Sequence, residues 1–324
     1  MNQTRVERAP ARSKSRVLQL VGEGAGSRLD LFLATELALS RAQVRRLLDS
    51  GAVALDGRIL SLADKGLPLP GRGELEVEAF RSPADQRVQE PPPDEPAPPI
   101  LASGDGWLAF DKPAGMPVHP LDEAERGTLL SYLVARHPET HGVGEGGLRS
   151  GVVHRLDVDT SGVMLVATQE RTWQRLRGAF HAHQVDKCYV ALVEGEPNWP
   201  VGGRDMRMWL SVSRHRPARV RVASDAQRGR GRAREIHQHV RLIESFGASS
   251  LVEVRPRTGF LHQIRASLAH LGHPVLGDSR YGASTPFPGV ERQLLHSRRV
   301  AFQEIEAESP LPADFLRLLG TLRG

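Results

Sequence analysis

The sequence predicts a globular protein of mixed helices and strands, with a small N-terminal part joined to a larger one. Apolar residues at helical spacing alternate with short apolar, β-branched runs along most of the chain. Residues 81–99 contain seven prolines among Asp, Glu and Gln side chains. That composition cannot build a core and is typical of a semi-stiff linker. The remaining length suffices for one small and one large domain.

Composition narrows the class of protein. Hydrophobic residues at 40% and charged residues at 25% fit a soluble domain. No apolar run approaches the ~20 residues that span a bilayer, and the N-terminus lacks the apolar core of a secretory signal. The single cysteine, Cys188, excludes an internal disulfide and a multi-cysteine zinc site. We therefore expect a cytoplasmic protein with no membrane partner. Its net charge of +5 favours polyanions.

The N-terminal part begins with a basic segment. Residues 1–16 are rich in arginine and almost free of apolar side chains, which predicts a disordered arm. Residues 17–80 follow as the small domain. Two helices are expected there, the first capped by Ser27 and the second ending at Gly51. A hairpin follows, turning at Asp56-Gly57.

Three arginines of the second helix lie away from its apolar stripe: Arg41, Arg45 and Arg46. Two short helices that lead into a Gly-turned strand, with arginines on the second helix, resemble the RNA-binding module named after ribosomal small-subunit protein four. The resemblance implies binding of structured RNA through its shape and phosphates. The alternative is a small capped domain whose arginines only face solvent.

Residues 100–324 form the predicted large domain. Its central stretch has two apolar runs, 151–153 and 163–168, which we expect to be short buried strands. The polar segment between them contains Asp157, a candidate nucleophile or base, and Arg155 is its nearest cation in sequence. A connecting loop whose Asp caps backbone amides is the alternative.

The flanking segments are expected as a strand at 107–110, helices at 128–135 and 169–183, a strand at 251–254, and a helix from Leu261 closed by Gly272. Residues 198–234 are rich in Arg and Gly, and we expect them to be an irregular, exposed connection.

Four motifs then resemble those of the RluA-type pseudouridine synthases. His-Arg-Leu-Asp-x-x-Thr-Ser-Gly at 154–162 matches the family's catalytic signature, and the Lys-Pro-x-Gly turn and Val-His-Pro at 112–120 match its first motif. A Lys-x-Tyr pair stands at 187–189. Residues 257–265 resemble the third motif, although Phe260 stands where an arginine is usual.

This resemblance implies an α+β fold, with a mixed, mostly antiparallel sheet around a central catalytic cleft. It also implies isomerisation of specific uridines in RNA to pseudouridine, without cofactor or metal. The Asp attacks uridine or its ribose while the base is detached, rotated and rejoined through carbon. Large-subunit ribosomal RNA is the expected substrate and transfer RNA the alternative. We expect a monomer.

The resemblance also implies roles for residues. Asp157 would be the nucleophile, Arg265 would pair with it, and Tyr189 would pack on the target base. Further residues of the motifs would contact RNA or the target nucleotide: His154, Arg155, Thr160, Lys187, His262, Gln263 and Ile264.

Two other classes stay open. A non-catalytic RNA-binding factor of ribosome assembly could use the same small domain and cleft. A metal-dependent hydrolase would need ligands, yet His270, His273 and His296 have no carboxylate or cysteine at ligand spacing. A nucleophile elbow and a Walker A motif are both absent from the sequence. We therefore expect no metal site.

Overall fold

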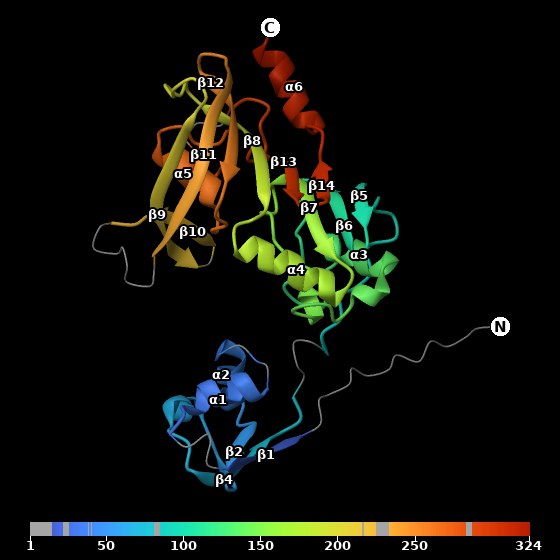
Figure 1. Ribbon diagram of the computed structural model, residues 1–324, viewed down its shortest axis with the longest axis vertical. Coiled ribbons are helices and arrows are strands. Elements are labelled where there is room, and N and C mark those ends of the chain that lie inside the picture. The colour runs from blue at the N-terminus through green and yellow to red at the C-terminus, as the bar shows by residue number, and fades with distance from the viewer. Residues whose placement is uncertain are drawn as a thin grey trace, which may run out of the picture. The chain divides into compact units, whose positions relative to one another are not determined.

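The computed structural model describes residues 15–21, 26–37, 39, 41–80, 85–215, 217–224, 233–282 and 287–324. The chain divides into two compact units, Met1–Arg87 and Val88–Gly324 (Figure 1). The predicted basic arm lies outside the described residues except at its end, where Arg16 begins the first strand. Of the Arg- and Gly-rich run near residue 230, residues 225–232 also lie outside them.

The N-terminal unit packs two helices on a small antiparallel sheet. Its strands lie in the order β1-β4-β2-β3. The elements are β1 (Arg16–Val21), α1 (Leu29–Glu36), α2 (Arg41–Asp49), β2 (Val53–Leu55), β3 (Arg58–Ile59), the 3-10 turn η1 (Leu62–Gly66) and β4 (Arg72–Val77). The apolar stripes of α1 and α2 face the buried side chains of β2 and β4 and form one core with them.

The predicted hairpin is confirmed, because Asp56 and Gly57 both have positive φ (48° and 79°), as the tight turn between β2 and β3 requires. The predicted Ser27 cap is wrong. Arg28 occupies the N-cap of α1 without a side-chain cap, and its guanidinium instead binds the fully buried carboxylate of Asp30 at 3.0 Å.

The C-terminal unit is built on a ten-stranded sheet in the order β10-β9-β11-β12-β8-β13-β7-β6-β5, with β14 paired to β13. Among the described strands, β13 and β7 form the one parallel pair. The predicted mixed, mostly antiparallel sheet of an α+β protein is confirmed. The strands are β5 (Ile100–Gly104), β6 (Trp107–Lys112), β7 (Ser161–Ala167), β8 (Asp186–Glu194), β9 (Arg204–His215), β10 (Ala218–Val222), β11 (Ala233–Ser245), β12 (Ser249–Pro256), β13 (Leu295–Phe302) and β14 (Ile305–Glu308).

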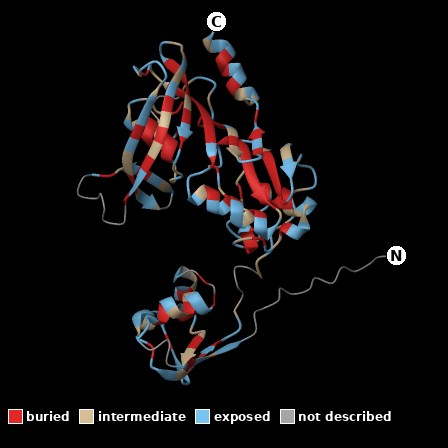
Figure 2. Ribbon diagram, in the orientation of Figure 1, coloured by how far each residue is buried: buried red, intermediate tan, exposed pale blue. Residues whose placement is uncertain are grey.

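Helices cover both faces of this sheet. They are α3 (Leu129–Arg136), α4 (Glu170–His181), α5 (Gln263–His270) and α6 (Ala313–Leu322). Successive side chains of a strand point to opposite faces. On β8, Tyr189 and Ala191 belong to the core formed with α3 and α5, whereas Val190 and Leu192 pack with α6. The central strands are accordingly buried along their length (Figure 2).

Two local predictions are wrong. Residues 204–222 are not an irregular connection, since β9 and β10 pair there with each other and β9 pairs with β11. Residues 151–153 form no strand and contribute only the single bridge from Val152 to Val166. The second run is β7, where Gly162 (φ 108°) allows close approach, because a Cβ there would lie 2.2 Å from the carbonyl oxygen of Ser297 on β13.

Candidate active site

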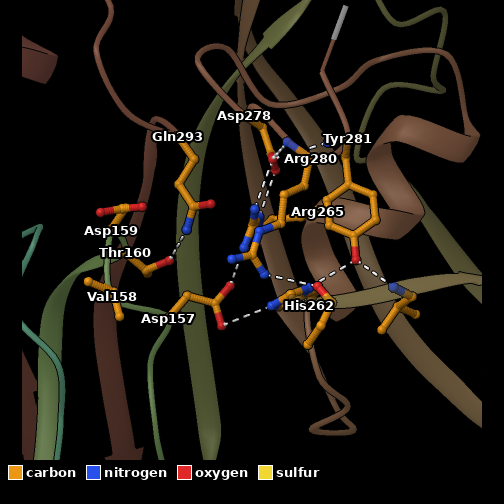
Figure 3. A network of polar contacts seen from close by, with 12 residues as sticks. Asp157, Val158, Asp159, Thr160, His262, Arg265, Asp278, Arg280, Tyr281 and Gln293 are labelled. Atoms are coloured by element: carbon orange, nitrogen blue, oxygen red, sulfur yellow. Dashed lines mark hydrogen bonds and ion pairs between the residues drawn. The ribbon is translucent and has the colours of Figure 1, made fainter. Parts of the chain in front are cut away.

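Asp157 and Arg265 meet on the α5 face of the sheet. Asp157 lies in the loop that enters β7, and Arg265 lies on α5, which follows β12. Two strands, β8 and β13, separate β7 from β12 in the sheet, so the two side chains reach toward each other across those strands. The Arg265 Nη1 donates to the Asp157 carboxylate at 2.7 Å (Figure 3). The structure thus brings together the two residues that the motifs single out.

Asp278 holds the other side of the same guanidinium. Arg265 donates through Nε at 2.6 Å and through Nη2 at 2.8 Å to the two oxygens of that carboxylate, which is fully buried. Burial opposes the charge of Arg265, but its hydrogen bonds to Asp278 and Asp157 outweigh burial and raise its pKa above the ordinary value. Two carboxylates thus share one guanidinium, and Asp157 is the member of this group that solvent reaches.

His262 lies on the second side of Asp157. Its backbone is left-handed (φ 50°), a conformation that costs about 1 kcal/mol for a residue with a side chain. The imidazole Nδ1 is 2.9 Å from the hydroxyl of Tyr281, which itself accepts from the amide of Val220 at 2.8 Å. The imidazole Nε2 lies 3.9 Å from the carboxylate of Asp157.

Tyr281 also stabilises the guanidinium, whose central carbon lies 5.3 Å from the centroid of the tyrosine ring. Burial lowers the pKa of His262, so the ring stays neutral near pH 7. Asp157 consequently faces one fixed cation and one neutral imidazole.

Apolar side chains form the floor beside Asp157. Leu156, Tyr189 and Ile264 pack in the same buried cluster. Burial raises the pKa of Tyr189 to about 12, with a smaller opposing effect of the Ser297 hydroxyl. The phenol therefore stays protonated at neutral pH and offers an aromatic surface.

Two buried polar side chains, Lys112 and Thr160, hold the Asp157 loop in place. The ammonium of Lys112, at the end of β6, is fully buried and donates at 2.8 Å to the carbonyls of Pro113, Met116 and Val158. Burial lowers the pKa of Lys112 to about 7. Thr160 is also buried, and its hydroxyl accepts from the side chain of Gln293 at 2.9 Å.

Three predicted contact residues are engaged within the protein. His154 stacks on Phe180 at 4.4 Å between centroids, and its Nε2 accepts from an amide of β7. The side chain of Gln263 accepts from the amide of Phe260 and donates to a neighbouring glutamine. Lys187 donates to the carbonyl of Thr258 at 3.1 Å, and burial lowers its pKa to about 8.

Four of the predicted RNA-contacting residues are exposed, one on the Asp157 loop and three in the N-terminal unit. Arg155 is exposed on the Asp157 loop. In the N-terminal unit Arg41 binds Asp30 at 3.3 Å, and Arg45 and Arg46 are exposed on α2.

Sequence reasoning missed two partners in the site, Asp278 and Tyr281. No function was predicted for the segment that contains them, and the one available signal was an acidic residue within a Leu-Gly-Asp sequence. Strand β9 was also missed, although its apolar residues Met206, Met208, Leu210 and Val212 recur at every second position, as a strand requires.

Within the described residues, no group of three or more His, Cys, Asp and Glu side chains is placed to hold a metal ion. Among the same residues, no helix combines the length and apolar character needed to cross a bilayer.

Two family models match the chain. The model described as RNA pseudouridylate synthase matches residues 106–270, and the S4 domain model matches residues 27–65. The first match contains the Asp157 loop, Tyr189 and Arg265. The second contains the three arginines of α2.

Relatives match over nearly the whole chain. An uncharacterized RNA pseudouridine synthase of Mycobacterium bovis is 38% identical over 93% of this chain and 96% of its own length. Ribosomal large subunit pseudouridine synthase D of Xanthomonas campestris is 33% identical over 97% and 94%. The solved structure of human RNA pseudouridylate synthase domain containing 4 has a TM-score of 0.56 at 24% identity, covers 69% of this chain and 92% of its own, and shares the fold.

Proposed function

Because the chain belongs to the RNA pseudouridylate synthase family, whose members are isomerases that act on RNA, we propose that it modifies uridines of large-subunit ribosomal RNA with Asp157 as the catalytic group. The observation that carries the proposal is the 2.7 Å contact between Asp157 and a buried arginine that Asp278 holds in place. A relative whose name specifies the ribosomal large subunit, together with the S4 domain, supports the choice of RNA.

The reaction is balanced without a co-reactant. The bond from the ribose C1′ to uracil N1 breaks, the ring turns, and a bond from C1′ to C5 replaces it. The proton that leaves C5 is matched by one gained at N1. Carboxylates serve as nucleophiles in glycosyl chemistry, and Asp157 would attack the ribose or the base while the ring is free.

The surrounding side chains support this role. Arg265 directs one oxygen of Asp157 through a charge-assisted contact. Tyr189 would pack on the uracil ring, which needs an aromatic or apolar surface once it leaves the RNA stack. With a pKa of about 12, its phenol is suited to packing and hydrogen bonding, and poorly suited to accepting the C5 proton as a phenolate.

Arg155, exposed two residues before Asp157, would help hold the flipped nucleotide or fill its place in the stack. Ile264 would complete the apolar wall. Lys112, Lys187, Thr160 and Gln263 would act indirectly, because their polar atoms bind the loops that carry the site.

The test is pseudouridine mapping, by mass spectrometry with pseudouridine-specific labelling, of ribosomal and transfer RNA from cells that lack the protein. Add-backs of the wild type and of Asp157→Ala complete the design. We expect one or a few ribosomal pseudouridines to disappear and only the wild type to restore them. Loss of pseudouridines from transfer RNA alone would show that transfer RNA is the substrate instead. Persistence of every pseudouridine would favour the non-catalytic binding factor.

A further inference from the structure

A second charged cluster lies beside the Asp157 loop. A cavity of about 90 Å³ opens there, and its walls include Arg149, Arg155 and Arg177. These residues come from the segment before the loop, from the loop itself and from α4. Asp157, Arg265 and the rest of their network do not line this cavity. We call it the arginine cavity.

One carboxylate pairs with two of the three guanidiniums. Glu145 accepts from Arg149 at 3.1 Å and from Arg177 at 3.3 Å. Arg155 has no hydrogen bond or ion pair with any residue that the structure describes. The arginine cavity thus carries an excess of two positive charges. Its ion pairs are open to water, since the side chains of Arg149, Arg177 and Glu145 are 55%, 48% and 37% exposed.

Side-chain contacts fix the short segment that leads into Arg155. Arg177 donates a second hydrogen bond, at 3.1 Å, to the carbonyl of Val153 at the start of the loop. The next residue, His154, is held by its stack on Phe180 and by an amide of β7. Exposed ion pairs contribute little to stability, so Glu145 can be exchanged for another anion at small cost.

We propose that the arginine cavity binds a phosphodiester of the RNA next to the target uridine, and that Glu145 occupies this place in the free protein. The proposal rests on the proposed function, because it assigns a contact of the same substrate. Arginine forks match phosphate oxygens in a bidentate manner. Two residues of extended chain span at most ~7 Å. Arg155 therefore places the bound phosphate close to the nucleotide that Asp157 attacks.

The experiment compares variants of the full chain on an unmodified transcript of large-subunit ribosomal RNA. Arg149→Ala with Arg177→Ala should raise KM by about tenfold, and the salt dependence of RNA binding should become shallower by about 0.7–0.9 in log–log slope for the one lost phosphate contact. The matched control is Arg175→Ala. It lies on the same helix, is also exposed, and pairs with Glu304 instead. Its KM and salt slope should equal those of the wild type.

Glu145→Gln supplies a second test that does not depend on the arginine variants folding well. It removes the competing negative charge and keeps the shape, so KM should fall several-fold. The proposal is overturned if Glu145→Gln leaves KM unchanged, or if the double variant lowers the melting temperature while its KM and salt slope match Arg175→Ala. Failure of the wild type to modify the transcript would instead contradict the proposed function.

Discussion

The two charged clusters beside the Asp157 loop use the same side-chain types in opposite ways. Arg265 is 5% exposed, and its guanidinium donates to two carboxylates at distances of up to 2.8 Å. In the arginine cavity two half-exposed arginines share one carboxylate at 3.1 and 3.3 Å, and a third has no partner among the described residues. A buried, saturated cluster fixes one geometry, whereas an exposed, unsaturated cluster can take up an anion. We propose accordingly that the first cluster serves the chemistry and that the second binds the substrate.

Removing one arginine from each cluster should give the largest difference in the free energy of unfolding. Arg265→Met leaves one buried and one partly buried carboxylate without their cation, which should cost about 3–5 kcal/mol of unfolding free energy and abolish turnover. Arg149→Met in the exposed cluster should change stability by about 0.5 kcal/mol or less. Urea unfolding of both variants measures this contrast. Equal losses would contradict the distinction.

Asp278→Asn should have the next largest effect. The amide keeps the shape but supplies fewer acceptors to Arg265, so the guanidinium and Asp157 lose their fixed position. A displacement of about 1 Å can cost ~100-fold in rate, and we expect kcat to fall by about 10–100-fold with a smaller change in KM. Single-turnover assays measure it. The control is Asp159→Asn, because Asp159 is an exposed carboxylate on the loop that carries Asp157. A change in KM alone for Asp278→Asn would instead show that Asp278 contributes to substrate binding.

His154, which lines the arginine cavity, should make the stability of the fold depend on pH. Burial lowers the pKa of His154 from its ordinary value of 6.5 to about 3, with smaller contributions from the cations of Lys187 and Arg177. The unfolded chain binds this proton below pH 6.5 and the folded chain does not, so its contribution to stability is complete above pH 6.5 and is lost as the pH falls toward 3.

Between pH 7 and pH 5 the wild type should therefore lose about 2 kcal/mol more than His154→Gln, which cannot titrate. Unfolding curves at the two pH values for both proteins give the difference, and the other histidines cancel. Parallel losses would show that His154 accepts a proton in the folded state.

Thr160→Val should have a smaller effect on stability than Arg265→Met. It removes the acceptor of the Gln293 side chain and preserves volume, so we expect a loss of about 1–2 kcal/mol. Thermal unfolding measures it. A stability equal to that of the wild type would mean that water replaces the lost contact and that the loop does not depend on it.

Local patterns predicted much of this fold. The hairpin at Asp56-Gly57 and the helices α3 and α4 follow from turn chemistry and apolar spacing. Strand β9 was hidden because its period of two runs through an Arg-rich segment. The short run before Asp157 resembled a strand, but it is not paired along its length.

The site was predictable only in part. Asp157 and Arg265 lie 108 residues apart, and motif resemblance linked them where no local rule could. Asp278 and Tyr281 escaped notice because their partners are set by tertiary packing of the segment after α5. Lys112 was interpreted as part of a rigid turn, and its three carbonyl contacts show that it holds the turn and the Asp157 loop together.

The most direct test of the central claim is turnover by purified Asp157→Asn on the unmodified ribosomal transcript, with RNA affinity measured in parallel. The amide keeps the contact with Arg265 sterically feasible while it removes the nucleophilic charge. We predict no detectable pseudouridine and an RNA affinity within about twofold of the wild type. Residual pseudouridine in a preparation free of other synthases would contradict the assignment of Asp157 as the catalytic group.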